Sequence, residues 1–419
     1  MKYVIVGTGS RGLIYGSWAR DNGITIAAIA DKRPDRLQNA GDLLLVPKKM
    51  RFSDADALFA KGKIADAALI CTQDQDHFGH VMQALRCGYD VLLEKPISPD
   101  PKECITIEET ANALGRRVTV CHVLRYTNFF TTIKQILDSG ELGKIVAIKH
   151  SENIGNFHMA HSFVRGNWRN EKTSCPIILA KSCHDLDILL WLVGSSCTKV
   201  SAFGSLSYFK ESNAPAGSAA RCCDCPVAKD CRYEAKKMYL PMLGQWPSDV
   251  VCVEQTEEAL LEALRTGPYG RCVYRCDNDV CDHMSTILEF EDGVTATFSL
   301  TAQTSACYRN IHIMCEDGEI EADDGKRQIL VRHHVSSQAD TFTERVIHVR
   351  TNGSGHGGGD AGIMADFTEG LNHGGDSRSS ISRSVESHLM AGAIELSRKT
   401  GATVDMAAYR DSLKEEKIT

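Results

Sequence analysis

The sequence predicts an N-terminal α/β domain with a doubly wound parallel sheet, followed by an α+β domain with a large, mostly antiparallel sheet. The chain has 419 residues, which exceeds what one ordinary hydrophobic core can organise. Apolar strands alternate with helical stretches in the first third, and turn signals between paired strands follow in the second half. We therefore expect a first domain over residues 1–124 and a second over residues 125–419.

Short apolar segments of the first domain are expected to be strands. They are Lys2–Val6, Ile24–Ala30, Ala67–Cys71, Asp90–Leu93 and Arg117–Val120. Helical stretches such as His77–Cys87 and Lys102–Leu114 lie between them. Because continuous apolar strands joined by helices are typical of a sheet buried on both faces, this pattern indicates a parallel sheet.

Hairpin signals mark the second domain. Asp292-Gly293 and Asp317-Gly318 each separate two apolar segments, and such dipeptides favour the two-residue turns of antiparallel strands. The expected strands are Lys144–Ser151, Thr198–Tyr208, Thr286–Glu291, Val294–Leu300, Asn310–Met314, Glu319–Ala322, Gln328–His333 and Arg345–Arg350. A glycine-rich connector follows at Asn352–Gly359. Helices are expected to cover one face of the sheet at Asp185–Leu192, Asp360–Leu371 and Ser384–Lys399.

Composition and charge exclude several classes of protein. Hydrophobic residues make up 43% of the chain and charged residues 24%, which argues against disorder. The formal net charge of −7 argues against nucleic-acid binding, which needs clustered Lys and Arg. No apolar stretch has the length of a membrane span, and the N-terminal apolar run is too short for a signal peptide. We expect a cytoplasmic protein that keeps most of its 17 cysteines as reduced thiols.

A glycine-rich motif directly follows the first expected strand and precedes a helix. Its residues are Gly7-Thr8-Gly9-Ser10-Arg11-Gly12. The first glycine permits a tight turn, the second lets the backbone approach a pyrophosphate, and the third allows close packing of the helix, whose N-terminus attracts phosphate. The motif predicts a dinucleotide-binding Rossmann domain, and a purely structural glycine turn is the alternative.

The second expected strand ends at Asp31, where an acidic side chain can hold the hydroxyls of the adenosine ribose. A carboxylate repels a 2′-phosphate, which favours NAD as the cofactor. Lys32 and Arg33 follow directly and can accommodate that phosphate, so NADP stays open.

Two further motifs follow later strands of the first domain. Cys71-Thr72, followed by His77, ends one strand, and Glu94-Lys95-Pro96 ends the next. Together with the glycine motif they resemble the Gfo/Idh/MocA oxidoreductase family, which includes inositol dehydrogenases and glucose–fructose oxidoreductase. The resemblance implies that these motifs contribute to the cofactor site and that the second domain is a large antiparallel sheet with helices on one face. It also implies NAD(P)-dependent hydride transfer at a ring CH–OH of a sugar, inositol or glycoside.

The resemblance also implies catalytic positions. Lys95 is expected between cofactor and substrate, and Pro96 is expected to help position the cofactor. Hydride removal from a carbinol carbon requires the hydroxyl proton to leave, and a positioned lysine can hold the alkoxide or relay that proton. The family also has an acid/base histidine in this part of its second domain, which His184 matches.

The surroundings of His184 depart from the family pattern. The residue four positions earlier is Ala180 and not the usual Asp, which puts the family's acid/base pairing in doubt. Lys181 lies three positions earlier and is expected to act as a second catalytic cation. Asp185 is a candidate substrate contact, although it can also simply favour the dipole of the following helix. A satisfied core histidine is the alternative interpretation of His184.

Two polar regions have the composition of a carbohydrate site, because aromatic faces and bidentate donors bind sugars. The run from His158 to Arg169 supplies the first, and the end of the last strand of the first domain supplies the second, at the edge where open α/β sheets bind ligands. Arg165 or Arg169 can clamp a carboxylate, and two histidines three positions apart can also bind a metal. The expected substrate contacts are His122, Arg125, Tyr126, His158, His161, Arg165 and Trp168.

A cysteine-rich segment, expected to be an insertion over about residues 211–276, has the spacing of a metal site. Tetrahedral zinc needs four soft ligands, and thiolates at short spacing supply them. We expect a structural zinc ion on Cys222, Cys225, Cys231 and Cys272, with Cys276 as the alternative fourth ligand. A group of reduced thiols and an iron–sulfur cluster are the other interpretations.

Three functions remain open at this point. The first is a dehydrogenase of carbohydrate CH–OH groups. The second is a redox-neutral glycosidase, known among relatives of the family, in which bound NAD oxidises a ring hydroxyl, elimination expels the aglycone, and the hydride returns. The third is a non-catalytic sugar or cofactor sensor, against which Lys95 and His184 argue. In each case we expect a small sugar or glycoside as partner, and a homodimer or homotetramer formed through the C-terminal sheet.

Overall fold

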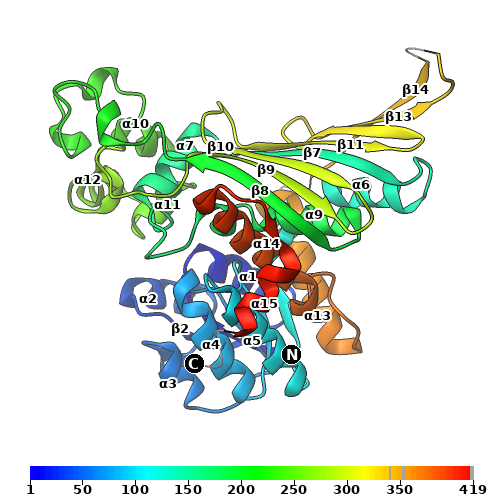
Figure 1. The fold of residues 1–419 in the computed structure, drawn as a ribbon. Coiled ribbons are helices and arrows are strands. Elements are labelled where there is room, and N and C mark those ends of the chain that lie inside the picture. The colour runs from blue at the N-terminus through cyan, green and yellow to red at the C-terminus, as the bar shows by residue number, and fades with distance from the viewer. Residues whose placement is uncertain (339–340, 352–354, 416–419) are drawn as a thin grey trace.

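The computed structural model describes residues 1–338, 341–351 and 355–415, so residues 352–354 of the expected connector lie outside the described residues. Figure 1 shows a first domain below a large curved sheet, with helices packed between them. Among the described residues, none of the helices combines the length and apolar character that a membrane span requires. The predicted fold class is confirmed in both halves.

The first domain is a parallel sheet in the order β3-β2-β1-β4-β5-β6. The strands are β1 (Lys2–Val6), β2 (Thr25–Ala30), β3 (Arg51–Phe52), β4 (Ala67–Ile70), β5 (Asp90–Leu93) and β6 (Val118–Val120). The helices are α1 (Ser10–Asp21), α2 (Pro34–Leu43), α3 (Ala55–Phe59), α4 (His77–Arg86) and α5 (Pro101–Ala113). The two-residue strand β3 escaped the sequence analysis because it is too short to show an apolar period.

The second sheet has the order β14-β13-β12-β11-β7-β10-β9-β8-β15 within the described residues. Among the described strands of this sheet, only β7 and β10 pair in parallel, and the other pairs are antiparallel. Its strands are β7 (Ile145–Asn153), β8 (Cys197–Ser205), β9 (His283–Phe290), β10 (Thr295–Thr301), β11 (Tyr308–Cys315), β12 (Gly318–Asp323), β13 (Gln328–His334), β14 (Phe342–His348) and β15 (Val404–Asp405).

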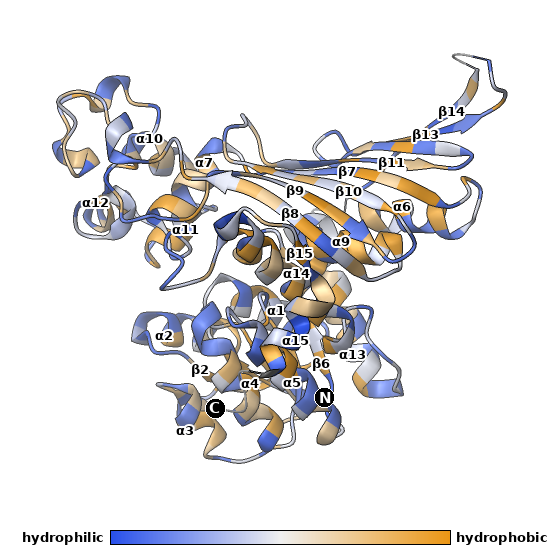
Figure 2. Ribbon diagram, in the orientation of Figure 1, coloured by the Kyte–Doolittle hydropathy of each residue, from blue (hydrophilic) through white to orange (hydrophobic). Residues whose placement is uncertain are grey.

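One face of this sheet is covered and the other is open. Helices α6 (Asn128–Asp138), α9 (Cys183–Val193) and α14 (Ile381–Thr400) lie on the side that faces the first domain (Figure 1). Buried and exposed residues alternate along β9 and β10, and Figure 2 shows the same alternation of hydrophobic and hydrophilic residues along the strands. The open face is therefore the half-solvated side that a hairpin-built sheet commonly retains.

Helix α13 (Gly359–His373) corrects one prediction. We expected the helix at Asp360–Leu371 to cover the sheet, but it packs against α1 in the first domain. Its buried Ile363 and Phe367 join the same core cluster as Tyr3, and the Tyr3 and Phe367 rings lie 6.0 Å apart. The apolar period of a helix identifies its buried face but not the partner of that face. Beyond α14, helix α15 (Met406–Glu415) also contacts α5 of the first domain.

The segment between β8 and β9 forms a small lobe with its own core, at the left of Figure 1. It contains α10 (Ala235–Tyr239), α11 (Ser248–Val251) and α12 (Glu257–Thr266). The cysteine-rich segment expected from the sequence lies within this lobe, and we keep the name insertion lobe for residues 206–282.

Candidate active site

The glycine loop has the close approaches that its motif predicts. Gly7 has a φ of +90°, and a Cβ atom there would lie 2.5 Å from the Cys71 carbonyl oxygen. A Cβ atom on Gly12 would lie 2.1 Å from the Gly7 carbonyl oxygen. At Gly9 the nearest atom is a guanidinium nitrogen of Arg36 at 3.4 Å, so this glycine faces space and not backbone. The loop therefore leaves an open approach in front of the N-terminus of α1, where a pyrophosphate fits.

Asp31 is fixed between the glycine loop and the end of β2. Its carboxylate accepts hydrogen bonds from the Thr8 backbone at 2.7 Å, the Thr8 hydroxyl at 2.9 Å and the Arg33 backbone at 2.8 Å. The two cations that follow it are paired with carboxylates, Lys32 with Asp76 at 3.3 Å and Arg33 with Asp35. The acidic group that favours NAD is thus in place, while both candidate 2′-phosphate ligands have acidic partners.

Arg11 lies in a buried ion network beneath the loop and not in the space before it. Its guanidinium is 2.7 Å from Glu94 and 2.6 Å from Asp360, and the Tyr15 hydroxyl donates to Glu94 at 2.7 Å. Burial opposes ionisation of Glu94, but the charges of Arg11 and Lys95 outweigh it and lower the pKa of Glu94. Arg11 and Glu94, both expected at the cofactor, therefore join the first domain to α13.

The loops after β4 and β5 are joined by His77. Its Nδ1 donates to the Pro96 carbonyl at 2.6 Å, and its Nε2 lies 3.2 Å from the Thr72 carbonyl. The neighbouring Ile97 backbone donates to Nε2 of His388 on α14 at 2.9 Å. These contacts hold the two loops that carry the expected cofactor residues, and His388 is a contributor that the sequence analysis missed.

Lys95 and His184 come from different domains and meet at this point. Nζ of Lys95 donates to the Ala180 carbonyl at 2.9 Å, one turn before His184. His184 is 5% exposed, and its Nδ1 has no hydrogen-bond partner among the described residues. Burial first, and then the charge of Lys95, hold the pKa of His184 well below its usual value. The arrangement places a neutral imidazole, which can accept a proton from a hydroxyl group, near an ammonium group, which can stabilise the alkoxide.

Lys181 and Asp185 belong to a buried charge network behind His184. Nζ of Lys181 lies 3.2 Å from Glu152, and Arg309 pairs with Glu152 at 2.5 Å and with Asp185 at 2.7 Å. His150 donates to Asp185 at 2.8 Å. Asp185, expected to contact substrate, is fully buried and bonded to protein groups, whereas Lys181 remains partly exposed beside the site.

The residues that follow β6 divide into two groups. Arg125 donates to both carboxylate oxygens of Asp187 at 2.7 and 2.8 Å, and the Tyr126 hydroxyl donates to Asp366 at 2.9 Å. Both are therefore engaged with helices of the second domain. His122 is fully buried, its ring lies 5.8 Å from that of His184, and neither of its ring nitrogens has a hydrogen bond within the described part of the chain. His122 is thus a buried neighbour of His184.

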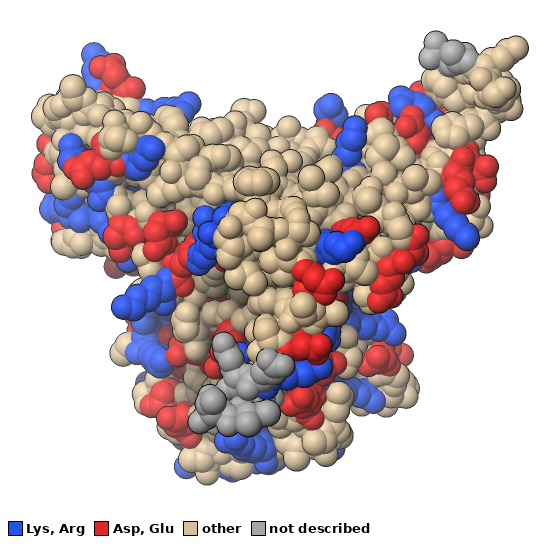
Figure 3. Space-filling view, viewed as in Figure 1, with Lys and Arg blue, Asp and Glu red and all other residues tan. Residues whose placement is uncertain are grey.

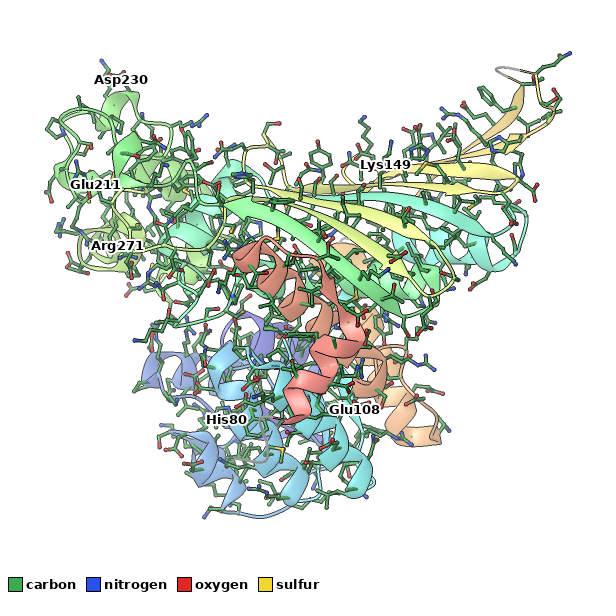
Figure 4. All side chains as sticks on the ribbon, in the orientation of Figure 1. His80, Glu108, Lys149, Glu211, Asp230 and Arg271 are labelled. Carbon is green, nitrogen blue, oxygen red and sulfur yellow. The ribbon has the colours of Figure 1, made fainter. Side chains whose placement is uncertain are left out.

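Most of the polar run from His158 to Arg169 holds the insertion lobe and does not face open space. Arg165 is fully buried and donates to the Arg271 and Tyr233 carbonyls at 2.7 Å each, and Figure 4 labels Arg271 in that lobe. His161 stacks on Tyr269 at 4.9 Å, and burial, aided by Arg165, lowers its pKa to about 3. Sequence composition gave no sign of this packing role.

The two other expected substrate contacts in the run, His158 and Trp168, lie nearer the site. The charges of Lys181 and Lys95 both act on His158, whose pKa burial lowers first and these charges lower further. Nε1 of Trp168 donates to Asp74 at 3.3 Å, in the loop after β4. Of the run, His158 and Trp168 therefore remain the candidates for substrate contact.

The predicted zinc site is not supported. Cys222, Cys225, Cys231 and Cys272 do line one small cavity, but no group of three or more His, Cys, Asp or Glu in the described residues is arranged to hold a metal ion. Arg165 donates to the sulfur of Cys222, and burial raises the pKa of that thiol. Close spacing in sequence brought these cysteines around one cavity, where Cys222 and Cys272 are buried and Cys225 and Cys231 are partly exposed.

His356 and Asp360 also lie at this site, although no sequence pattern predicted a role for them there. The His356 ring lies 6.3 Å from that of His184, and its Nδ1 is 3.2 Å from Asp360. His356 lies within the glycine-rich connector and Asp360 directly follows it. The connector has no periodic pattern, so no local signal distinguishes the two residues from surface residues.

Protein-family models match most of the chain. A model described as the NAD-binding Rossmann fold of an oxidoreductase family matches residues 1–122, and the C-terminal alpha/beta domain of the same family matches residues 134–406. The YteT protein of Bacillus subtilis is 22% identical over 312 residues, 72% of each chain. Inositol 2-dehydrogenase of Streptomyces avermitilis is 31% identical over 183 residues, 43% of this chain and about half (48%) of that enzyme.

Solved structures share the fold over nearly the whole chain. Levoglucosan dehydrogenase in complex with NADH has a TM-score of 0.73 at 17% identity, covering 97% of this chain and 99% of that one. An oxidoreductase from Agrobacterium radiobacter in complex with NAD+, L-tartaric acid and magnesium has a TM-score of 0.69 at 18% identity, with the same coverage of 97% and 99%. At these identities the likeness concerns the fold.

Proposed function

Because the chain belongs to the Gfo/Idh/MocA oxidoreductase family, we propose that it transfers a hydride between a nicotinamide dinucleotide and a ring CH–OH of a sugar, inositol or glycoside. The observation that carries this proposal is the position of Lys95, whose ammonium group donates to the Ala180 carbonyl one turn before His184 and, after burial, lowers the pKa of His184. The relatives support a carbohydrate-type substrate, since one is an inositol 2-dehydrogenase and a structural neighbour was solved with NADH and levoglucosan.

The proposed chemistry balances one hydride with one proton. When bound, NAD supplies the nicotinamide carbon that accepts the hydride from the substrate carbon. The hydroxyl proton passes to the neutral His184, and the ammonium group of Lys95 stabilises the developing alkoxide. Lys181, held by Glu152, adds a second positive charge to this side of the site.

We propose NAD as the preferred cofactor, with the glycine loop at the pyrophosphate and Asp31 at the adenosine ribose. Asp31→Ala is expected to weaken NAD binding by about 10–100-fold, because a charged hydrogen-bond acceptor is lost. The same change should reduce the ratio of NAD affinity to NADP affinity, since the carboxylate that repels the 2′-phosphate of NADP is also lost. Calorimetric titration with both cofactors measures the two effects. Asp138→Ala, which removes an exposed carboxylate on α6 away from the glycine loop, is the control. An unchanged NAD to NADP ratio in Asp31→Ala would assign the ribose to another residue.

A reduction screen tests the function itself. Purified protein with NAD is incubated with free sugars, inositols and aryl glycosides, while NADH absorbance and product mass are followed in parallel. Net NADH with a product two hydrogens lighter supports the dehydrogenase. Release of the aryl alcohol without net NADH would instead support the redox-neutral glycosidase. Absence of both signals would favour a non-catalytic sensor.

We also propose that the open face of the large sheet pairs with a second copy of the chain. Two exposed apolar side chains lie on neighbouring strands of that face, Phe203 on β8 and Ile287 on β9, with 73% and 59% exposure. Figure 3 shows few charges along the middle of the upper layer, and Lys149, labelled in Figure 4, is a charge that projects from the face. Such a patch is typical of a protein interface.

We also propose a cytoplasmic location, because all 17 cysteines are free thiols.

Ile287→Glu is expected to convert the oligomer into monomer, because a charge would be buried without a partner. Light scattering after size-exclusion chromatography gives the mass directly. Val335→Glu, which places the same charge on an equally exposed aliphatic residue after β13, should leave the mass unchanged. A monomeric wild-type protein at micromolar concentration would contradict the proposed interface.

A further inference from the structure

His356 connects the buried site to solvent. Its side chain is 45% exposed, while His184, whose ring lies 6.3 Å away, is 5% exposed. The two imidazoles are also electrically coupled, because the charge of a protonated His356 disfavours protonation of His184. At this ring separation one water molecule can bridge them by hydrogen bonds.

The orientation of the His356 ring is set by a buried carboxylate. Its Nδ1 lies 3.2 Å from both oxygens of Asp360 and donates to them. Asp360 is in turn held by Arg11 at 2.6 Å. Because Nδ1 carries the proton of the neutral ring, Nε2 is the nitrogen left free to accept one. An Asp–His pair of this kind fixes the tautomer that a proton carrier needs.

The proposed reaction creates a need for such a carrier. For each hydride that leaves the substrate carbon, the hydroxyl oxygen gives one proton to His184. His184 is buried among Lys95, His122 and Arg309, and each of these groups disfavours a lasting positive charge on its ring. His122, its other close imidazole neighbour, is fully buried and offers no exposed nitrogen.

We propose that His356 relays this proton between His184 and solvent, an inference that rests on the proposed function. In oxidation the proton leaves protonated His184, passes through one bridging water to Nε2 of His356, and is released from His356 to bulk buffer. Reduction uses the same route in reverse. His356 does not touch the reacting atoms and acts only through His184. The charged groups that face it are Arg11 and Asp360, and the titratable group that faces it from α9 is His184.

The test is His356→Asn, followed by rescue with a small buffer. His356 has a φ of +49°, a left-handed conformation that Asn tolerates better than most residues, so the backbone should be kept. In dilute buffer of poor proton-carrying capacity, the steady-state rate of NADH formation should fall about 10-fold or more. Added imidazole should restore it towards the wild-type rate. The dissociation constant for NAD and the melting temperature should stay unchanged. If His356 had only a structural role, its loss would lower the melting temperature or weaken NAD binding, and imidazole would not restore the rate.

His373→Asn is the matched control, because His373 lies on the same helix as Asp360 with a 71% exposed side chain. It should show neither the rate loss nor an imidazole effect. A wild-type rate for His356→Asn in dilute buffer, or a loss that imidazole does not restore, would overturn the relay. Absence of any wild-type turnover in the carbohydrate screen would overturn the proposed function. The relay would then be overturned with it, because no reaction would release a proton. The wild-type measurement therefore separates the two failures.

Discussion

Lys95→Met should lose hydride transfer by roughly 1,000-fold while binding NAD with nearly unchanged affinity. The ammonium group is anchored on the Ala180 carbonyl at 2.9 Å, and its charge lowers the pKa of His184, His122 and His158. A methionine keeps the length of the side chain but can neither hold an alkoxide nor carry a proton. Single-turnover kinetics with the substrate found in the screen, together with NAD titration, measure the two quantities.

The same variant makes a prediction about pH. Oxidation needs a neutral His184, so the rate falls when the pH drops below the pKa of that residue. Removing the charge of Lys95 raises this pKa, and the acid limb of the residual rate should move to higher pH. Lys95→Arg, which keeps the charge, should leave the acid limb in place and retain part of the activity. Near-wild-type turnover of Lys95→Met would remove Lys95 from the mechanism.

Arg309→Met should lower the free energy of unfolding by about 3–5 kcal/mol, because it leaves buried carboxylates without a cation. Arg309 pairs with Glu152 at 2.5 Å and Asp185 at 2.7 Å, and both carboxylates are fully buried. Urea denaturation at neutral pH measures the loss. The matched control is Arg332→Met on β13, whose three glutamate partners are partly exposed, and it should cost no more than about 1 kcal/mol.

The pH dependence of this variant identifies the cause of its instability. Burial opposes ionisation of Asp185, but Arg309 and His150 outweigh it and lower the pKa of Asp185 in the wild type. This residue therefore stabilises the fold above its unfolded pKa of about 3.9, and that contribution is lost as the pH falls. Without Arg309 the pKa of Asp185 rises, so the deficit of the variant should be largest at neutral pH and shrink in acid. A deficit that does not change with pH would assign the effect to packing.

Local patterns carried most of what could be predicted. The glycine loop and Asp31 lie close together in the chain, and both belong to one known dinucleotide-binding motif. The hairpins at Gly293 and Gly318 are equally local. His356 and His388 reach the site from elements far along the chain, and neither differs in sequence context from an ordinary surface or helix histidine. Contacts that depend on tertiary packing leave no such record in a single sequence.

The same reason explains the errors among the site residues. Arg165 was expected to clamp a carboxylate and Asp185 to contact the substrate, although charged residues that are paired can also be buried. Each is instead fully buried, because carbonyl groups of the insertion lobe surround Arg165, and Arg309 and His150 neutralise Asp185. Composition could not distinguish a polar group that binds substrate from one that holds two parts of the fold together.

The packing of α13 on the first domain has a consequence for biosynthesis. Tyr3 and Ile5 are fully buried in the finished protein, and their cluster includes Ile363 and Phe367 from α13. The ribosome releases the parallel sheet long before α13 emerges, so the nascent first domain exposes part of this cluster during elongation. Chaperones that recognise exposed apolar surface should therefore engage the growing chain until α13 docks. The two domains, separate in sequence, complete their folding together.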